Sequence, residues 1–263
     1  MIKKPLRWLA SLLNLRRQAR FVTWILPNQY WYRAALTACR LQAAISSWFG
    51  GNPVLTEAVM LDHWLWELTA IGPYPIPWIL HGEDVIKAAD PRIGTVYCWI
   101  HEPLVEVPMR AFLELGYPEA MVVADRGRIV DDGKYRVLGM KTQLTAIPAD
   151  RYALGRAKRS LNEGMSVVCL ADEYLGGPLL PYVLQLAGRV KARVVFQWAV
   201  RRPDGTIEVT FMNAPRPHCE TDEAVHENLD FLSAAQQRAL SRLGLPQHKP
   251  TLTATPTRSP RQT

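Results

Sequence analysis

The chain has 263 residues, of which 48% are hydrophobic, and its formal net charge is +7. A chain of this length and composition can bury a sizeable core without dividing, so we expect one main domain. No charge-free apolar run reaches the roughly 20 residues of a membrane-spanning helix, and no convincing small-residue cleavage site follows the first leucines. We therefore expect neither a spanning helix nor a secretory signal peptide.

The cysteines are scattered and form no Cys-x-x-Cys pair. Two of them fall in predicted buried strands, so we expect free thiols in a reducing compartment. The four are Cys39, Cys98, Cys169 and Cys219.

The first 56 residues contain eight Lys or Arg and no acidic residue, so the remaining residues together carry about −1. Polar side chains recur at helical spacing, first from Arg7 to Gln18 and again from Arg33 to Ser47. A basic amphipathic arm favours an anionic membrane surface, at roughly 1 kcal/mol for each basic residue near it. We therefore predict membrane-associating helices over residues 1–50. The alternative is that these helices pack on the domain and their charges are solvated.

Nucleic acid ranks lower as a partner of the basic arm, because the chain has no recognisable nucleic-acid-binding motif.

After the arm, Asp62–Glu67 opens or continues a helix, and Gly72–Pro77 is too rich in proline for regular structure. The Trp- and Pro-rich run up to Leu80 is open to two interpretations. It is either an apolar site for an acyl chain or a membrane, or a structural loop packed on the core.

The segment around His101 combines a strand end with two carboxylates. Thr95–Ile100 is rich in β-branched and aromatic residues and follows the breaker Gly94, so it predicts a buried strand. His101 then lies at the carboxyl end of that strand, where open α/β sheets bind ligands. Pro103 is suited to a first helical turn, and from such a turn Glu106 can reach back to His101.

A neutral histidine held by a carboxylate is a general base, since the carboxylate fixes its tautomer and stabilises the imidazolium. Glu102 is a rival carboxylate for this role. A His-Glu-x-x-His zinc motif fails, because Val105 occupies the position of the second histidine. The segment alone also fits a solvated histidine in a strand-to-helix turn.

The rest of the chain alternates strands and helices. We predict strands at 120–124, 165–171, 194–200 and 206–211, the last two joined by a Pro-Asp-Gly hairpin, and helices at 107–115 and 221–243. Asp172 and Glu173 end the 165–171 strand, so in a parallel sheet they open on the same crevice as His101. A dense polar set at 218–226 (His218, Cys219, Glu220, Asp222, His226) is interpreted as an ordinary polar loop, and no metal site is predicted.

Several of these motifs occur in a recognisable order. His101 and Glu106 form His-x4-Glu, residues 161–173 give a helix end, glycine turn, strand and acidic pair, and residues 186–202 add a helix end, a strand and an arginine segment. Over roughly residues 90–212 this series resembles the lysophospholipid and glycerolipid acyltransferase superfamily, most closely its branch of lipid A late acyltransferases and mycobacterial mannoside acyltransferases. The residues between His101 and Glu106, and the stretch 175–181, depart from that branch and leave the acceptor open.

The resemblance implies an α/β fold with a central, mostly parallel sheet flanked by helices, behind the basic amphipathic arm. It implies catalysis by His101 and Glu106, with Arg126, Asp172 and Glu173 as substrate-binding candidates. It also implies direct acyl transfer from acyl-CoA or acyl-carrier protein to a hydroxyl of a lipid or glycolipid, at the cytoplasmic face of a bacterial inner membrane and without a cofactor. The oxyanion is expected near backbone N–H groups of the Pro103 helix start or near an arginine.

The expected organisation is an arm over 1–50, an acyltransferase domain over 51–245 and a disordered Pro/Thr-rich tail over 246–263. Two other functions remain open from sequence. One is an inactive membrane-binding scaffold on the same fold, and the other is a hydrolase of thioesters or esters.

Overall fold

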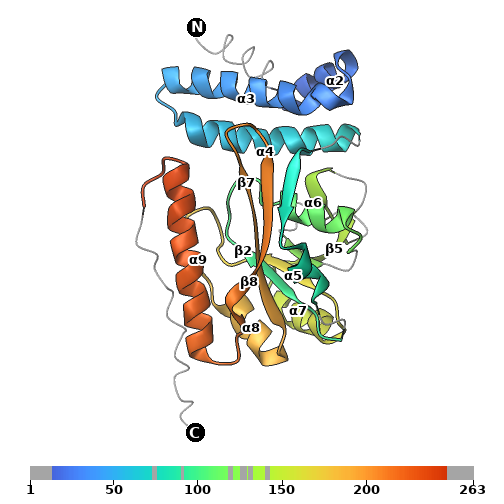
Figure 1. The fold of residues 1–263 in the computed structure, drawn as a ribbon, viewed down its shortest axis with the longest axis vertical. Helices are drawn as coiled ribbons and strands as arrows, with labels where there is room; N and C mark the ends of the chain where they lie inside the picture. The colour runs from blue at the N-terminus through green and yellow to red at the C-terminus, as the bar shows by residue number, and fades with distance from the viewer. Residues whose placement is uncertain are drawn as a thin grey trace.

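A single eight-stranded sheet flanked by helices forms the centre of the molecule (Figure 1). The computed structural model describes residues 14–72, 76–89, 92–117, 121–124, 129, 133–139 and 143–247. The strand order is β1-β8-β7-β2-β6-β3-β5-β4, and neighbouring strands are parallel except in the pairs β7–β8 and β4–β5. The prediction of a mostly parallel α/β sheet is therefore confirmed.

The five predicted strands are present as β2, β3, β6, β7 and β8, although β8 extends beyond the predicted end, and the structure adds β1, β4 and β5. The Trp78 region, which the sequence allows as an apolar site or a packed loop, is an edge strand parallel to β8. The predicted Pro-Asp-Gly hairpin joins β7 to β8 in antiparallel register. The strands are β1 (Trp78–His81), β2 (Val96–Trp99), β3 (Met121–Ala124), β4 (Lys134–Arg136), β5 (Gln143–Pro148), β6 (Val167–Leu170), β7 (Arg193–Arg201) and β8 (Ile207–His218).

The helices divide between the two faces of the sheet and an outer layer. They are α2 (Leu15–Ile25), α3 (Trp31–Trp48), α4 (Pro53–Ile71), α5 (Glu83–Lys87), α6 (Val107–Glu114), α7 (Ala153–Asn162), α8 (Tyr182–Val190) and α9 (Asp222–Arg242), with short 3-10 helices η1 (Asn28–Tyr30) and η3 (Val137–Gly139). The predicted helices at 107–115 and 221–243 are confirmed as α6 and α9.

The central strand β2 is buried along its whole length because it separates two apolar cores. Val96 and Cys98 pack in the core that includes Leu161 and residues of α8 and α9. Tyr97 points the other way, into the core shared with α4 and α6, where its ring meets Phe112 edge-on at 5.0 Å. Alternate side chains of a strand face opposite sides of the sheet, so a continuous apolar run marks a strand buried on both faces.

The glycine before β2 is required by close packing. A Cβ on Gly94 would lie 1.9 Å from the carbonyl oxygen of Met165. Its N–H donates to the Leu161 carbonyl at 2.9 Å, which ties the start of β2 to the end of α7. Any larger residue here would push β2 away from the turn that leads into β6.

Helices α2 and α3 form an outer layer, and α4 lies between this layer and the sheet (Figure 1). The predicted stripe from Arg33 to Ser47 is exposed, while the opposite face of α3, including Leu36 and Cys39, is buried. The arm therefore packs on the domain through one face and presents its charges on the other. Residues 1–13 lie outside the described residues. In the described part of the chain, no helix combines the length and apolar character needed to span a membrane.

The turn after β2 differs from the prediction. We expected a helix to begin at Pro103, but α6 begins at Val107 and has Pro108 in its first turn. Residues 103–106 form turns instead, in which Leu104 is buried and has a left-handed backbone conformation with φ of 71°. A bulky side chain rarely adopts this conformation, so the turn must be held by its surroundings. One such restraint is Asp62 of α4, whose carboxylate accepts the Leu104 N–H at 3.3 Å.

Candidate active site

His101 and Asp172 form a hydrogen-bonded pair at the carboxyl ends of β2 and β6. These strands are parallel neighbours with Trp99 opposite Leu170, so both side chains emerge at the same edge of the sheet. Asp172 Oδ1 accepts the backbone N–H of His101 at 2.7 Å and contacts the ring Nδ1 at 2.9 Å. The Asp172 side chain is fully buried, whereas 37% of the His101 side chain is exposed. A carboxylate on Nδ1 favours the tautomer with the proton there, which leaves the Nε2 lone pair as a base.

The second oxygen of Asp172 is held by helix α9. Gln236 Nε2 donates to Asp172 Oδ2 at 3.1 Å and to the Gly177 carbonyl at 2.9 Å. Gln236 is itself buried, so this amide fixes both the carboxylate and the loop that follows it. Asp172, a substrate-binding candidate from sequence, has a fully buried side chain that contacts His101 and does not line the pocket described below.

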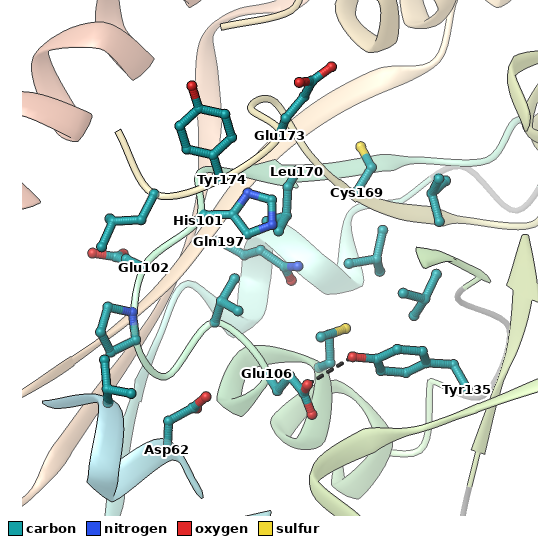
Figure 2. A pocket seen from close by; sticks show the side chains of 18 residues that line it. Asp62, His101, Glu102, Glu106, Tyr135, Cys169, Leu170, Glu173, Tyr174 and Gln197 are labelled. Carbon is teal, nitrogen blue, oxygen red and sulfur yellow. Dashed lines mark hydrogen bonds between the residues drawn. The ribbon is translucent and has the colours of Figure 1, made fainter. Parts of the chain in front are cut away.

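Glu106 lies apart from the His101 ring nitrogen and serves another contact. Its Oε1 accepts the Tyr135 hydroxyl at 2.8 Å, and its Oε2 accepts the Leu138 backbone N–H at 2.9 Å. Figure 2 shows its carboxylate directed toward Tyr135. The physical reason is the delayed start of α6, which turns residues 103–106 away from the path that a helix from Pro103 would take. The carboxylate on Nδ1 is therefore Asp172, where the sequence led us to expect Glu106.

Glu102, the rival carboxylate, forms hydrogen bonds with Trp99 and Arg242. Its Oε1 accepts the Trp99 indole N–H at 2.6 Å, and its Oε2 accepts from Arg242 of α9 at 2.9 Å. Burial raises the pKa of Glu102 above its ordinary value, although both hydrogen bonds act in the opposite direction. Glu102 thus joins the turn after β2 to the last turn of α9.

Glu102→Gln is expected to flatten the dependence of stability on pH. A carboxyl whose pKa is raised on folding binds more protons in the native state, so its contribution to stability falls as pH rises from about 4.5 through the folded pKa. Glutamine has no such titration and keeps an acceptor for Trp99. Urea unfolding from about pH 4 to pH 8 measures the slope. The exposed Glu220→Gln is the control, and a slope identical in wild type and Glu102→Gln would contradict this assignment.

A pocket with a volume of about 420 Å³ opens beside His101, on the face of the sheet that carries α4 and α6 (Figure 2). Apolar atoms make up most of its surface, but four carboxylate side chains also line it, those of Asp62, Glu102, Glu106 and Glu173. Glu173 lines this pocket, as predicted from the strand end. Arg126 lies outside the described residues. The lining residues are Val59, Asp62, His101, Glu102, Pro103, Val105, Glu106, Met109, Val122, Val123, Tyr135, Val168, Cys169, Leu170, Glu173, Tyr174, Leu175 and Gln197.

The expected oxyanion site at a Pro103 helix start does not form. The N–H groups of Leu104, Val105 and Val107 donate to Asp62, to the Glu102 carbonyl and to the Leu104 carbonyl respectively. These three N–H groups are therefore already engaged, two of them within the turn and one with α4. A helix that starts four residues later places its first N–H groups elsewhere.

Sequence reasoning missed Gln236, Tyr135, Gln197 and Asp62. Each comes from an element remote in sequence from His101 and carries no motif, so only the folded chain brings it to the site. Gln197 has the clearest sequence signal, because it is an amide inside the apolar strand 194–200. A polar residue inside a buried strand needs a partner, and this requirement identifies it as a candidate.

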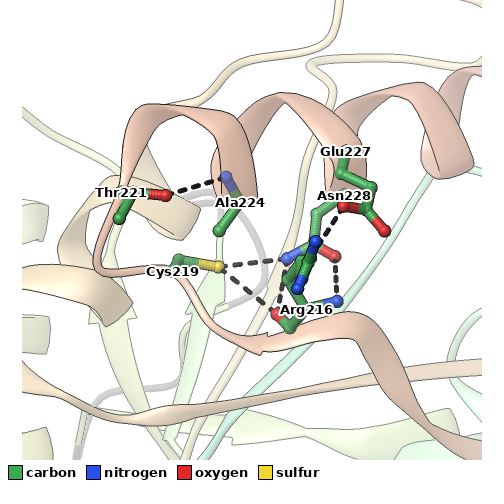
Figure 3. Close-up of polar contacts among 6 residues, drawn as sticks. All are labelled: Arg216, Cys219, Thr221, Ala224, Glu227 and Asn228. Carbon is green, nitrogen blue, oxygen red and sulfur yellow. Dashed lines mark hydrogen bonds and ion pairs between the residues drawn. The ribbon is translucent and has the colours of Figure 1, made fainter.

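The segment around Cys219, within the polar set at 218–226, joins β8 to α9 (Figure 3). Asn228 Nδ2 donates to Cys219 Sγ at 3.1 Å and to the Arg216 carbonyl at 2.8 Å, and Thr221 caps α9 by accepting the Ala224 N–H. These contacts join the end of β8 to α9. Among the residues that the structure describes, no group of three or more His, Cys, Asp or Glu is placed to hold a metal ion. All four cysteines are buried free thiols, as predicted.

Fold and site together define a mixed α/β protein with a buried carboxylate behind a histidine, beside a pocket whose surface is mostly apolar. No protein-family model matches the sequence, and no curated protein matches it significantly. Function must therefore be argued from the site.

Proposed function

We propose that the protein is a membrane-associated acyltransferase that moves an acyl group from acyl-CoA or acyl-carrier protein to a hydroxyl of a lipid or glycolipid. His101 Nε2 takes the proton of the acceptor hydroxyl, whose oxygen attacks the thioester carbonyl. The C–O bond forms, the C–S bond breaks, and the proton passes from His101 to the departing thiolate. Asp172, rather than Glu106, keeps the ring in the required tautomer.

The observation that carries this proposal is the placement of the His101–Asp172 pair beside a pocket whose surface is mostly apolar. A base alone fits many reactions, whereas an apolar wall next to the base suits an acyl chain. No covalent acyl-enzyme is needed, because the acceptor oxygen can attack directly. Glu106 and Tyr135 shape the wall of the same pocket.

The test is to incubate the purified protein with radiolabelled acyl-CoA or acyl-carrier protein and a bacterial lipid extract. If the protein transfers the acyl group, a new labelled lipid ester should form, and only when the lipid extract is present. Release of labelled free acid at the same rate with and without lipid would identify a thioester hydrolase instead. Binding to vesicles without turnover of any thioester would favour the scaffold.

The outer helices present a surface suited to the membrane contact. Large apolar side chains are exposed at helical spacing on both, with Phe21, Trp24 and Ile25 on α2 and Leu41, Ile45 and Trp48 on α3, followed by Phe49. Trp24, Trp48 and Phe49 are 83%, 81% and 84% exposed. Exposed arginines accompany them at positions 16, 17, 20, 33 and 40. Aromatic residues with basic neighbours are typical of helices that lie in a lipid interface.

Replacing Trp24, Trp48 and Phe49 by serine is expected to weaken binding to phosphatidylglycerol vesicles by at least about tenfold. The apolar area that these side chains bury in the lipid on binding supplies much of the affinity. Vesicle sedimentation measures the change. The control replaces Tyr152 and Leu154, which are also exposed but lie near the start of α7, away from the outer layer (Figure 1). Equal vesicle binding by wild type and the triple variant would contradict the proposal that α2 and α3 contact the membrane.

A further inference from the structure

Gln197 is a buried polar residue whose hydrogen-bonding capacity is incompletely used. Only 2% of it is exposed, and its Oε1 has no hydrogen-bond partner among the residues that the structure describes. Buried side-chain oxygens of native proteins nearly always have a partner, since an unpaired one costs free energy. Such an orphaned acceptor in a pocket wall indicates a ligand that supplies the missing donor.

The register of the sheet places this amide next to the reactive histidine. Phe196 pairs with Cys98 of β2, so Gln197 lies one residue further toward the strand end that carries His101. Phe196 belongs to the core on the α8 and α9 side, whereas Val195 belongs to the core on the α4 side. Gln197 therefore faces the pocket, and it lines the same cavity as His101.

The carboxamide also lies among polar side chains that are already paired. In the view of Figure 2 it lies between the His101 ring and the Glu106 carboxylate. Glu106 is already engaged by Tyr135 and Leu138, and Asp172 is engaged by His101 and Gln236. The Gln197 oxygen is a fully buried acceptor in this wall that has no hydrogen-bond partner among the residues that the structure describes.

We infer that Gln197 recognises a second hydroxyl of the substrate, distinct from the one that is acylated, by accepting its hydrogen bond at Oε1 inside the pocket. This inference rests on the proposed function for the identity of the substrate. The hydroxyl has two chemical sources: a hydroxyl of the acceptor beside the reacting one, or a hydroxyl on the acyl chain near its carbonyl. A pocket built around such a contact discriminates against the analogue that lacks the hydroxyl, because the amide is then left unpaired.

Binding of small amphiphiles tests the inference without requiring turnover. The probes form two pairs that differ by one hydroxyl: 1,2-decanediol against 1-decanol for the acceptor source, and 3-hydroxydecanoate against decanoate for the acyl source. Titration calorimetry of the full-length wild-type protein is expected to give about tenfold tighter binding for the hydroxylated member of one pair, the ratio that one ordinary hydrogen bond supplies. The pair that shows the preference identifies the source. Partition onto the exposed apolar helices would favour the other member of each pair, so it cannot produce this result.

Gln197→Met, which is similar in length but has no amide, is expected to reduce that ratio to about one. Its unfolding midpoint without ligand is expected to equal or exceed that of wild type, because an apolar side chain removes the unpaired oxygen. Gln185→Met on α8, on the other side of the sheet, is the matched control and should keep the wild-type ratio.

Equal binding within both pairs by wild type would overturn the inference, as would a preference that survives in Gln197→Met. The wild-type comparison decides the matter even if the variant does not fold. The outcome is separable from the proposed function. A hydroxyl preference without acyl transfer would support the role of Gln197 and contradict the proposed acyltransferase activity. Acyl transfer without any hydroxyl preference would support the activity and contradict the role of Gln197.

Discussion

His101→Ala is expected to lower the rate of acyl transfer by about 10³-fold, within the range that a positioned general base contributes. The acceptor hydroxyl is a weak nucleophile until its proton leaves, and Nε2 of His101 is the base available beside the pocket. Because His101 is partly exposed at the end of β2, its loss removes little packing and the fold should survive. The measurement is the initial rate of labelled ester formation at saturating thioester, together with the urea unfolding curve of the variant.

His226→Ala is the control, since this exposed histidine on α9 contacts the Asp222 carbonyl in its own helix and does not line the pocket. It should transfer acyl groups at the wild-type rate. Wild-type activity in folded His101→Ala would remove the mechanism.

Asp172→Asn is expected to lower the rate by about 10³–10⁴-fold while leaving the pocket in place. Asparagine removes the negative charge that stabilises the imidazolium. If its N–H₂ turns toward Nδ1, at the expense of the bond from the His101 backbone N–H, it also stabilises the opposite tautomer, with the ring proton on Nε2. The base is then lost although every side chain remains near its position. The effect should be confined to turnover, so the rate constant should fall far more than the Michaelis constant rises.

The comparison with Glu106→Gln distinguishes the two carboxylates. Glu106 holds Tyr135 and Leu138, so its amide variant should change turnover much less than Asp172→Asn does. The exposed Asp230→Asn on α9 controls for loss of a charge. A large loss of activity in Glu106→Gln beside near-normal activity in Asp172→Asn would restore Glu106 as the partner of His101.

In a variant that combines His101→Ala with Asp172→Asn, the two losses of rate should not add, because both residues act as one unit.

Local patterns were sufficient for most of the fold. The apolar run 95–100, the glycine before it and the Pro-Asp-Gly hairpin each encode their element through short-range chemistry. The start of α6 could not be read in this way. Pro103 suits a first helical turn, but so does Pro108, and the contact between Asp62 and the Leu104 N–H favours the later start.

The sequence by itself determined that His101 ends a buried strand and that Asp172 and Glu173 end another. Apolar runs and their breakers fix strand ends, and parallel strands open at one edge of a sheet. Only the tertiary structure decided which carboxylate meets His101. That choice depends on β2 and β6 being neighbours, on the left-handed turn at Leu104 and on Gln236 reaching in from α9. These are contacts between segments up to 71 residues apart, and side-chain geometry across such distances leaves no periodic signal in the chain.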